Sequence, residues 1–261
     1  MTPERIDILG VGVSAINMDM AIDTIDQWIA KRQYHYVCCT DVHGVVRSQS
    51  DRRLREIQDK AGLVTPDGMP LVWISRLRNY RQVGRVYGPD LMSEICSNSA
   101  ARGYRHFLFG GNKEVPGKLA NHLMHKYPGI QIVGTYSPPF RPLTCEEDEA
   151  IIRRINDSQA DIVWVGIGSP KQEYWMAAHL GRLNVPVMIG VGAAFDFLAG
   201  VKKQAPRWIQ RSGFEWLFRL ITEPRRLWRR YLKIVPLFLY YMALESLGFR
   251  DRKKRVDRVV Q

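Results

Sequence analysis

The sequence lacks the short motifs that identify many nucleotide-dependent enzymes. It contains no Asp-x-Asp, the carboxylate pair that often holds a divalent cation against a nucleotide diphosphate. It also contains no GxGxxG and no GxxxxGK[ST], which disfavours dinucleotide redox chemistry and P-loop phosphoryl transfer. We therefore predict neither a cofactor nor a metal site. If a diphosphate binds, arginine or lysine side chains must neutralise its charge.

Cysteines and long apolar runs are also scarce. The four cysteines have no CxxC and no zinc-ligand spacing, which favours a reducing compartment over a disulfide framework. The start of the chain has no apolar segment typical of a signal peptide. The uncharged stretch 234–244 is too short to span a bilayer. These absences predict a cytoplasmic location.

Positive charge is in excess, and most of this excess lies at the C-terminal end. The net charge is +12, and residues 207–261 hold 14 Lys or Arg against 5 Asp or Glu. Such asymmetry predicts an anionic partner, which could be phosphate, nucleic acid or membrane lipid. Trp and Tyr alternate with the arginines, a mixture that suits a helix lying in a membrane interface. A helical hairpin packed on the rest of the chain is the alternative.

Short apolar runs alternate with helical patterns along the first 200 residues. We expect strands at 6–11, 36–40, 62–65, 105–110, 130–136, 161–167 and 186–192. We expect helices over 21–32, 51–61 and 69–78, and from about 115, 146 and 170. This alternation predicts a Rossmann-like α/β body over residues 1–200, with a parallel sheet covered by helices on both faces. A basic, aromatic helical appendage with breaks at Pro224 and Pro236 is predicted over 201–261.

Polar and glycine-rich segments follow the predicted strands. In an open parallel sheet, ligands bind beyond the carboxyl ends of the strands. The segments at these ends are Thr40–Asp41, Asp67, Gly110–Gly111, 168–173 and Asp196. Residues 65–68 (TPDG) also fit a plain type I turn. The alternative, which the other segments favour, is that Asp67 is held over a cleft.

Several motifs together resemble a known family. "TPDGMPLVW", "RVYGPDLM", "FLFGG", "VGIGSPKQE", "GVGAAFDFLAG" and "APRWIQRSGFEWLFRLITEPRRLWRRY" occur in order over about residues 5–235. They resemble the WecG/TagA/CpsF glycosyltransferases of glycosyltransferase family 26. The resemblance implies an inverting transfer from a UDP-sugar to a polyprenyl-diphosphate-linked saccharide, at the inner face of the bacterial membrane.

The resemblance also implies roles for individual residues. Asp67 matches the catalytic base, and Arg85 and Gln172 match pocket residues. Arg219, Arg226 and Arg229 match positions that close over the diphosphate, and they would share one helix face if Pro224 only kinks the segment. With these we expect Thr40, Asp41, Gly110, Gly111 and Asp196 to bind substrate. One departure concerns the family's Thr-x-Asn, because Cys39 and Asp41 stand at those positions.

The physical requirements of this chemistry agree with the residues. An inverting transfer needs one base for the acceptor hydroxyl and positive charge beside the departing UDP. Asp67 supplies the first and the basic tail the second, without a metal. We expect a peripheral enzyme that contacts anionic lipid of the inner leaflet and does not bind nucleic acid.

Two other functions compete with this one. A nucleotide-sugar or polyanion-binding protein without catalysis would also have a basic tail, although it would not need Asp67. A UDP-sugar epimerase is disfavoured by the missing NAD motif. The donor sugar, the acceptor and the linkage stay open, and a homo-oligomer is compatible with the sequence.

Overall fold

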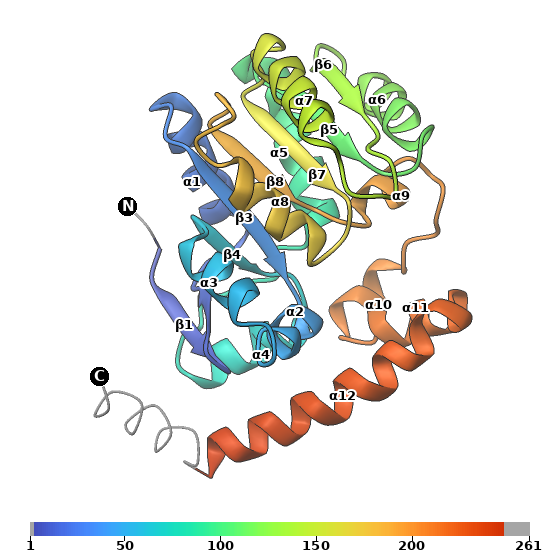
Figure 1. The fold of residues 1–261 in the computed structure, drawn as a ribbon. Helices are drawn as coiled ribbons and strands as arrows, with labels where there is room; N and C mark the ends of the chain where they lie inside the picture. Colours follow the sequence, from blue (N-terminus) through green and yellow to red (C-terminus); the bar gives the residue numbers. More distant parts are fainter. Residues whose placement is uncertain (1–2, 248–261) are drawn as a thin grey trace.

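The computed structural model describes residues 3–247, and a single parallel sheet forms its centre. Six strands lie in the order β4-β3-β8-β7-β5-β6, and every neighbouring pair is parallel (Figure 1). The strands are β3 (His35–Thr40), β4 (Leu63–Pro66), β5 (Arg105–Gly110), β6 (Gln131–Tyr136), β7 (Ile162–Gly166) and β8 (Val187–Gly190). Helices cover both faces, which confirms the predicted α/β fold.

The two faces of the sheet bury separate apolar cores. Helices on the first face are α1 (Met18–Ala30), α5 (Gly88–Arg102), α6 (Val115–Lys126) and α9 (Ala194–Leu198). Helices on the second face are α2 (Val42–Arg47), α3 (Arg52–Lys60), α4 (Met69–Leu77), α7 (Cys145–Asp157) and α8 (Lys171–His179). Successive strand residues alternate between the cores: Leu108 faces the first, and Phe107 and Phe109 face the second. This alternation explains why the strands read as continuous apolar runs.

The first apolar run forms a hairpin, so the prediction of one strand over 6–11 was wrong. Strands β1 (Arg5–Ile8) and β2 (Val11–Ser14) pair antiparallel outside the main sheet. Leu9 and Gly10 both have positive φ, 53° and 80°, as the two-residue turns that suit hairpins require. The Asp7 carboxylate accepts a hydrogen bond from the Gly10 amide at 2.5 Å and supports this turn.

The C-terminal part forms three helices. They are α10 (Arg207–Arg211), α11 (Glu215–Thr222) and α12 (Pro224–Ser246). Pro224 occupies the first turn of α12, so α11 and α12 are separate helices. Arg219 and the later arginines therefore do not share one continuous helix, contrary to that expectation.

Helix α12 continues through Pro236, so the predicted break there was wrong. A proline removes one helical hydrogen bond, to the carbonyl of Leu232 in this case. Leu232 is largely exposed, which leaves that carbonyl close to water. Ile234 and Phe238 on either side are buried in the second core and hold both halves of the helix against the body. Figure 1 shows α12 as one rod running beside α2 and α4.

No helix within residues 3–247 has the length and apolar content required to cross a bilayer.

Candidate active site

A cleft of about 1560 Å³ opens where the parallel strands end. The chain leaves β3 into Asp41, β4 into Asp67, β5 into Gly111 and β7 into residues 167–169, and all of these line the cleft. The C-terminal segment contributes the opposite wall through residues of α11 and α12. The cleft therefore lies between the sheet edge and the last two helices.

Asp67 directly follows the last residue of a buried strand. All four residues of β4 are buried, and Thr65 and Pro66 belong to the strand and not to a separate turn. The Asp67 amide donates hydrogen bonds to the carbonyl oxygens of Thr40 at 3.0 Å and Thr65 at 2.9 Å. These bonds fix the backbone, so the side chain is presented to the cleft by the sheet itself.

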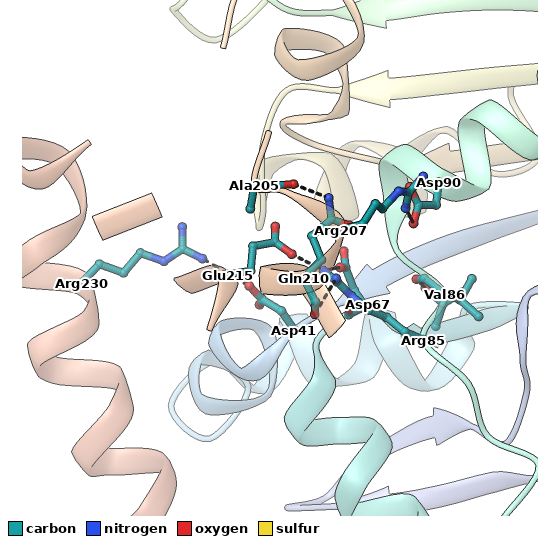
Figure 2. A network of polar contacts seen from close by, with 11 residues as sticks. Asp41, Asp67, Arg85, Val86, Asp90, Ala205, Arg207, Gln210, Glu215 and Arg230 are labelled. Atoms are coloured by element: carbon teal, nitrogen blue, oxygen red, sulfur yellow. Dashed lines mark hydrogen bonds and ion pairs between the residues drawn. The ribbon is translucent and has the colours of Figure 1, made fainter. Parts of the chain in front are cut away.

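Arg85 links Asp67 to the C-terminal segment. Its Nε donates to the Asp67 carbonyl at 2.5 Å, and its Nη2 lies 3.8 Å from Asp67 Oδ1 and 2.5 Å from Glu215 Oε2. Its Nη1 donates to the Gln210 carbonyl at 3.4 Å, and its guanidinium stacks 4.1 Å from the centre of the Tyr87 ring. Figure 2 shows Glu215 and Gln210 meeting Arg85 and Asp67 from the C-terminal segment.

The environment of Asp67 brings its titration near neutral pH. Burial raises the pKa of its carboxyl from the ordinary 3.8 to about 7. Arg85 opposes this rise, whereas the charges of Asp41 and Glu215 add to it and Arg219 lowers it. A carboxyl with this pKa can take a proton from a hydroxyl at physiological pH, which is the requirement for a general base.

Two arginines from the last helices face the sheet edge. Arg230 of α12 reaches toward Asp41, with its Nη2 3.6 Å from Asp41 Oδ2 (Figure 2). The Arg219 guanidinium of α11 lies 5.8 Å from the centre of the Phe197 ring. The Nε atoms of both arginines are buried without a hydrogen-bond partner in the described part of the chain. Unpartnered cationic donors in a cleft can bind an anion.

Asp41 has both a structural and an electrostatic role. Its Oδ1 accepts a hydrogen bond from the Gly44 amide at 3.0 Å and caps α2. Burial acts to raise the pKa of Asp41, but Arg230 and His43 outweigh it and hold that pKa below 3.8. Asp41 is therefore ionised while Asp67 titrates near neutrality.

Gln172 and Glu173 form a buried polar pair at the start of α8. Gln172 lines the cleft, and its Nε2 donates to Glu173 Oε1 at 3.2 Å. Gln172 Oε1 has no partner within residues 3–247. A Cβ at Gly190 would lie 2.9 Å from Gln172 Nε2, so a larger residue there would displace the end of the Gln172 side chain. Burial raises the pKa of Glu173 to about 7.

Several predicted site residues lie elsewhere. Thr40 is buried and accepts a hydrogen bond from Gln58 Nε2 at 3.3 Å, and its neighbour Cys39 lines the cleft instead. Gly110 lies behind the lining, where a Cβ would come within 2.5 Å of the Gly166 backbone. Arg229 is exposed and lies 5.2 Å from the centre of the Trp228 ring.

Two of the remaining predicted residues lie on the surface of the cleft. Asp196 lines the cleft, and its carboxylate lies 2.7 Å from Lys202 Nζ. Gly111 also lines it, and its amide donates to the Gly166 carbonyl at 3.0 Å. The side chain of Arg226 lies outside the described residues. The binding roles of all these residues stay predictions.

Glu215 and Arg230 line the cleft, and Glu173 contacts the lining residue Gln172, but none of the three was singled out from the sequence. Glu215 is one of three acidic residues in 207–247, and an acid in so basic a segment is a weak signal of an ion pair. Arg230 could not be told from its neighbour Arg229 without the orientation of α12. Glu173 was expected only as part of the segment 168–173, without a role of its own.

Among the described residues, no group of three His, Cys, Asp or Glu side chains is placed to hold a metal ion.

The fold and the cleft define an α/β enzyme whose site combines a carboxyl that titrates near neutrality with several arginines. The sequence profile of the glycosyl transferase WecG/TagA/CpsF family matches residues 6–252. The chain belongs to this family of glycosyltransferases.

Relatives with an assigned activity cover nearly the whole chain. The N-acetylglucosaminyldiphosphoundecaprenol N-acetyl-beta-D-mannosaminyltransferase of Staphylococcus aureus strain NCTC 8325 is 28% identical over 251 residues. This alignment includes 95% of the present chain and 96% of the relative. The enzymes of the same name from strains COL and MRSA252 match equally well.

Proposed function

We propose that this protein transfers a hexose or an N-acetylhexosamine from a UDP-sugar to a polyprenyl-diphosphate-linked saccharide, with inversion at the anomeric carbon and without a metal ion. The observation that carries the proposal is the position of Asp67, a carboxyl with a pKa of about 7 on the sheet edge, facing a cleft that also holds arginines. The activity assigned to the Staphylococcus aureus relatives supports the lipid-linked acceptor.

In the proposed reaction, Asp67 takes up one proton and UDP is the leaving group. The ionised Asp67 carboxylate accepts the proton of an acceptor hydroxyl, and the hydroxyl oxygen forms a bond to the anomeric carbon. The bond between that carbon and the donor phosphate breaks on the opposite face, and UDP leaves with the electron pair. This direction of attack inverts the anomeric configuration.

Arginines are proposed to stabilise the departing diphosphate. Arg219 and Arg230 line the cleft with buried, unpartnered Nε donors. Donors fixed in place before the reaction stabilise developing charge more effectively than mobile solvent does. Arg226 and Arg229 keep their predicted role in closing over the diphosphate, which Arg229 can take only by leaving its stacked position on Trp228.

Residues 201–261 are proposed to act as an appendage that completes the site and holds the enzyme on the inner face of the membrane. Helices α11 and α12 supply Glu215, Arg219 and Arg230 to the cleft. The outer surface of α12 combines exposed Trp228 and Tyr240 with basic residues, which suits an interface rich in anionic lipid. The pathway would be the synthesis of a bacterial surface polysaccharide or teichoic acid.

The test is UDP release with a panel of donors and N-acetylglucosamine linked to a polyprenyl diphosphate. The donor panel consists of UDP-N-acetylmannosamine, its uronic acid and UDP-glucose, and it tests which sugar the enzyme transfers. Acceptor-dependent UDP release and a product of inverted configuration by NMR are expected for at least one donor. Binding of UDP-sugars without release, with every acceptor, would instead indicate the non-catalytic binding protein.

A further inference from the structure

The cleft extends away from Asp67 into a groove with two apolar walls. One wall is a face of α4, on which Met69, Trp73 and Leu77 follow one another at intervals of four residues. The other wall is a face of α12. Its lining residues are Ile234, Val235, Phe238, Leu239 and Met242. The α4 wall is about 12 Å long at 1.5 Å per residue.

Several of these apolar side chains are exposed. Trp73 is 45%, Leu77 84% and Leu239 63% accessible to solvent. Large apolar side chains that face one another across a groove are a usual sign of a ligand or partner. The groove belongs to the same cleft as the catalytic carboxyl, so its occupant is expected to be continuous with the substrate.

The two ends of the groove differ in charge. The inner end begins at Met69, two residues after Asp67, close to Arg85, Arg219 and Arg230 in the same lining. At the outer end, Arg78 forms an ion pair with Glu245 and ties the end of α4 to α12. A ligand that fits this arrangement has an anionic head and an apolar tail.

We propose that the groove between α4 and α12 binds the first isoprene units of the acceptor, so that the enzyme itself, and not only the membrane, recognises the lipid. This inference rests on the proposed function. An isoprenoid diphosphate has the required order of groups, because its diphosphate joins the sugar to an apolar chain. A second protein copy would cover the groove without placing any group at Asp67.

The test compares acceptors that share one head group and differ in the tail. Kinetics are measured without vesicles, on N-acetylglucosamine diphosphate esters of a methyl group and of a farnesyl chain. For the wild-type enzyme, we expect the KM of the farnesyl acceptor to be at least about tenfold lower, because the tail loses contact with water in the groove.

Polar substitutions in the groove should reduce this preference. Leu77→Gln and Leu239→Gln each replace an exposed leucine, so the fold is expected to persist, which a thermal melt checks. Each should reduce the ratio of the two KM values about fivefold. The matched control is Leu232→Gln, which changes an equally exposed leucine of α12 outside the cleft lining and should keep the wild-type ratio.

The outcomes separate this inference from the function on which it rests. Turnover with equal KM values for both acceptors would overturn the proposal for the groove but leave the proposed glycosyltransfer intact. The same holds if the ratio of the two KM values is unchanged in the groove variants. An equal loss in the Leu232→Gln control would also overturn it. No turnover with either acceptor would instead reject the proposed function.

Discussion

Replacing Asp67 by asparagine should separate catalysis from folding. Asn is nearly isosteric but cannot accept the proton, and general-base contributions amount to about 10²-fold or more in rate. Arg85 keeps its contact with Glu215 at 2.5 Å, so the substitution leaves no unpaired buried cation. We therefore expect kcat to fall at least about 100-fold while UDP-sugar binding persists.

The same substitution should stabilise the folded enzyme at alkaline pH. The pKa of Asp67 in the folded protein, about 7, lies above its ordinary value of 3.8, so the folded state binds the proton more tightly than the unfolded chain. The favourable contribution of this group is complete below pH 3.8 and is lost as the pH rises through 7. The difference between the two pKa values corresponds to about 4 kcal/mol. Because one-fifth of the side chain is exposed, we expect about 2 kcal/mol.

The measurements are UDP release and urea unfolding at pH 4 and pH 8.5. Asp67→Asn should be as stable as wild type at pH 4 and more stable at pH 8.5. Asp157→Asn, an exposed aspartate remote from the cleft, serves as the control and should change neither quantity. Near-wild-type turnover of Asp67→Asn would remove Asp67 from the mechanism. A variant less stable than wild type at pH 8.5 would show that burial does not destabilise the ionised carboxylate.

Two further predictions concern the charges of the site, and a third concerns the exposed face of α12. EDTA should leave turnover largely intact, because Arg85, Arg219 and Arg230 supply positive charge; complete loss restored by Mg²⁺ or Mn²⁺ would refute this. Glu215→Gln removes a charge that raises the pKa of Asp67, so the acidic limb of the kcat–pH profile should move below pH 7. An unchanged or higher midpoint would contradict the assignment of this limb to Asp67. The double variant Trp228→Ser, Tyr240→Ser should sediment about tenfold more weakly with anionic vesicles. Its melting temperature should not fall, because both side chains are exposed. Unchanged sedimentation would argue against membrane contact by this face of α12.

The sequence predicted those parts of the fold that depend on local pattern. The helix expected over 51–61 is present as α3, and its apolar residues Leu54 and Ile57 are buried. The hairpin of β1 and β2 escaped prediction because its turn places a leucine, Leu9, at positive φ, where glycine or asparagine is usual. The break expected at Pro236 is absent because the packing of Ile234 and Phe238 on either side outweighs the missing hydrogen bond.

Prediction of the site was limited by distance along the chain. Asp67 could be located because parallel topology places every strand end on one edge. The partner of Arg85 could not, because Glu215 lies 130 residues further along and only the docking of α11 brings them together. The choice between Arg229 and Arg230 depends on the rotation of α12 about its axis, which Ile234 and Phe238 determine by packing.

The position of β8 in the sheet has a consequence for biosynthesis. β8 pairs with β3 on one side and with β7 on the other, so without it the sheet consists of two unconnected pieces. A ribosome adding about 5–20 residues per second needs roughly 8–30 seconds to advance from β3 to β8. Throughout this interval the nascent chain carries unpaired apolar strand edges, which are sites for pairing with other chains. Assistance from chaperones would be needed most before Val187 has left the ribosome, and least once β8 has joined the two pieces.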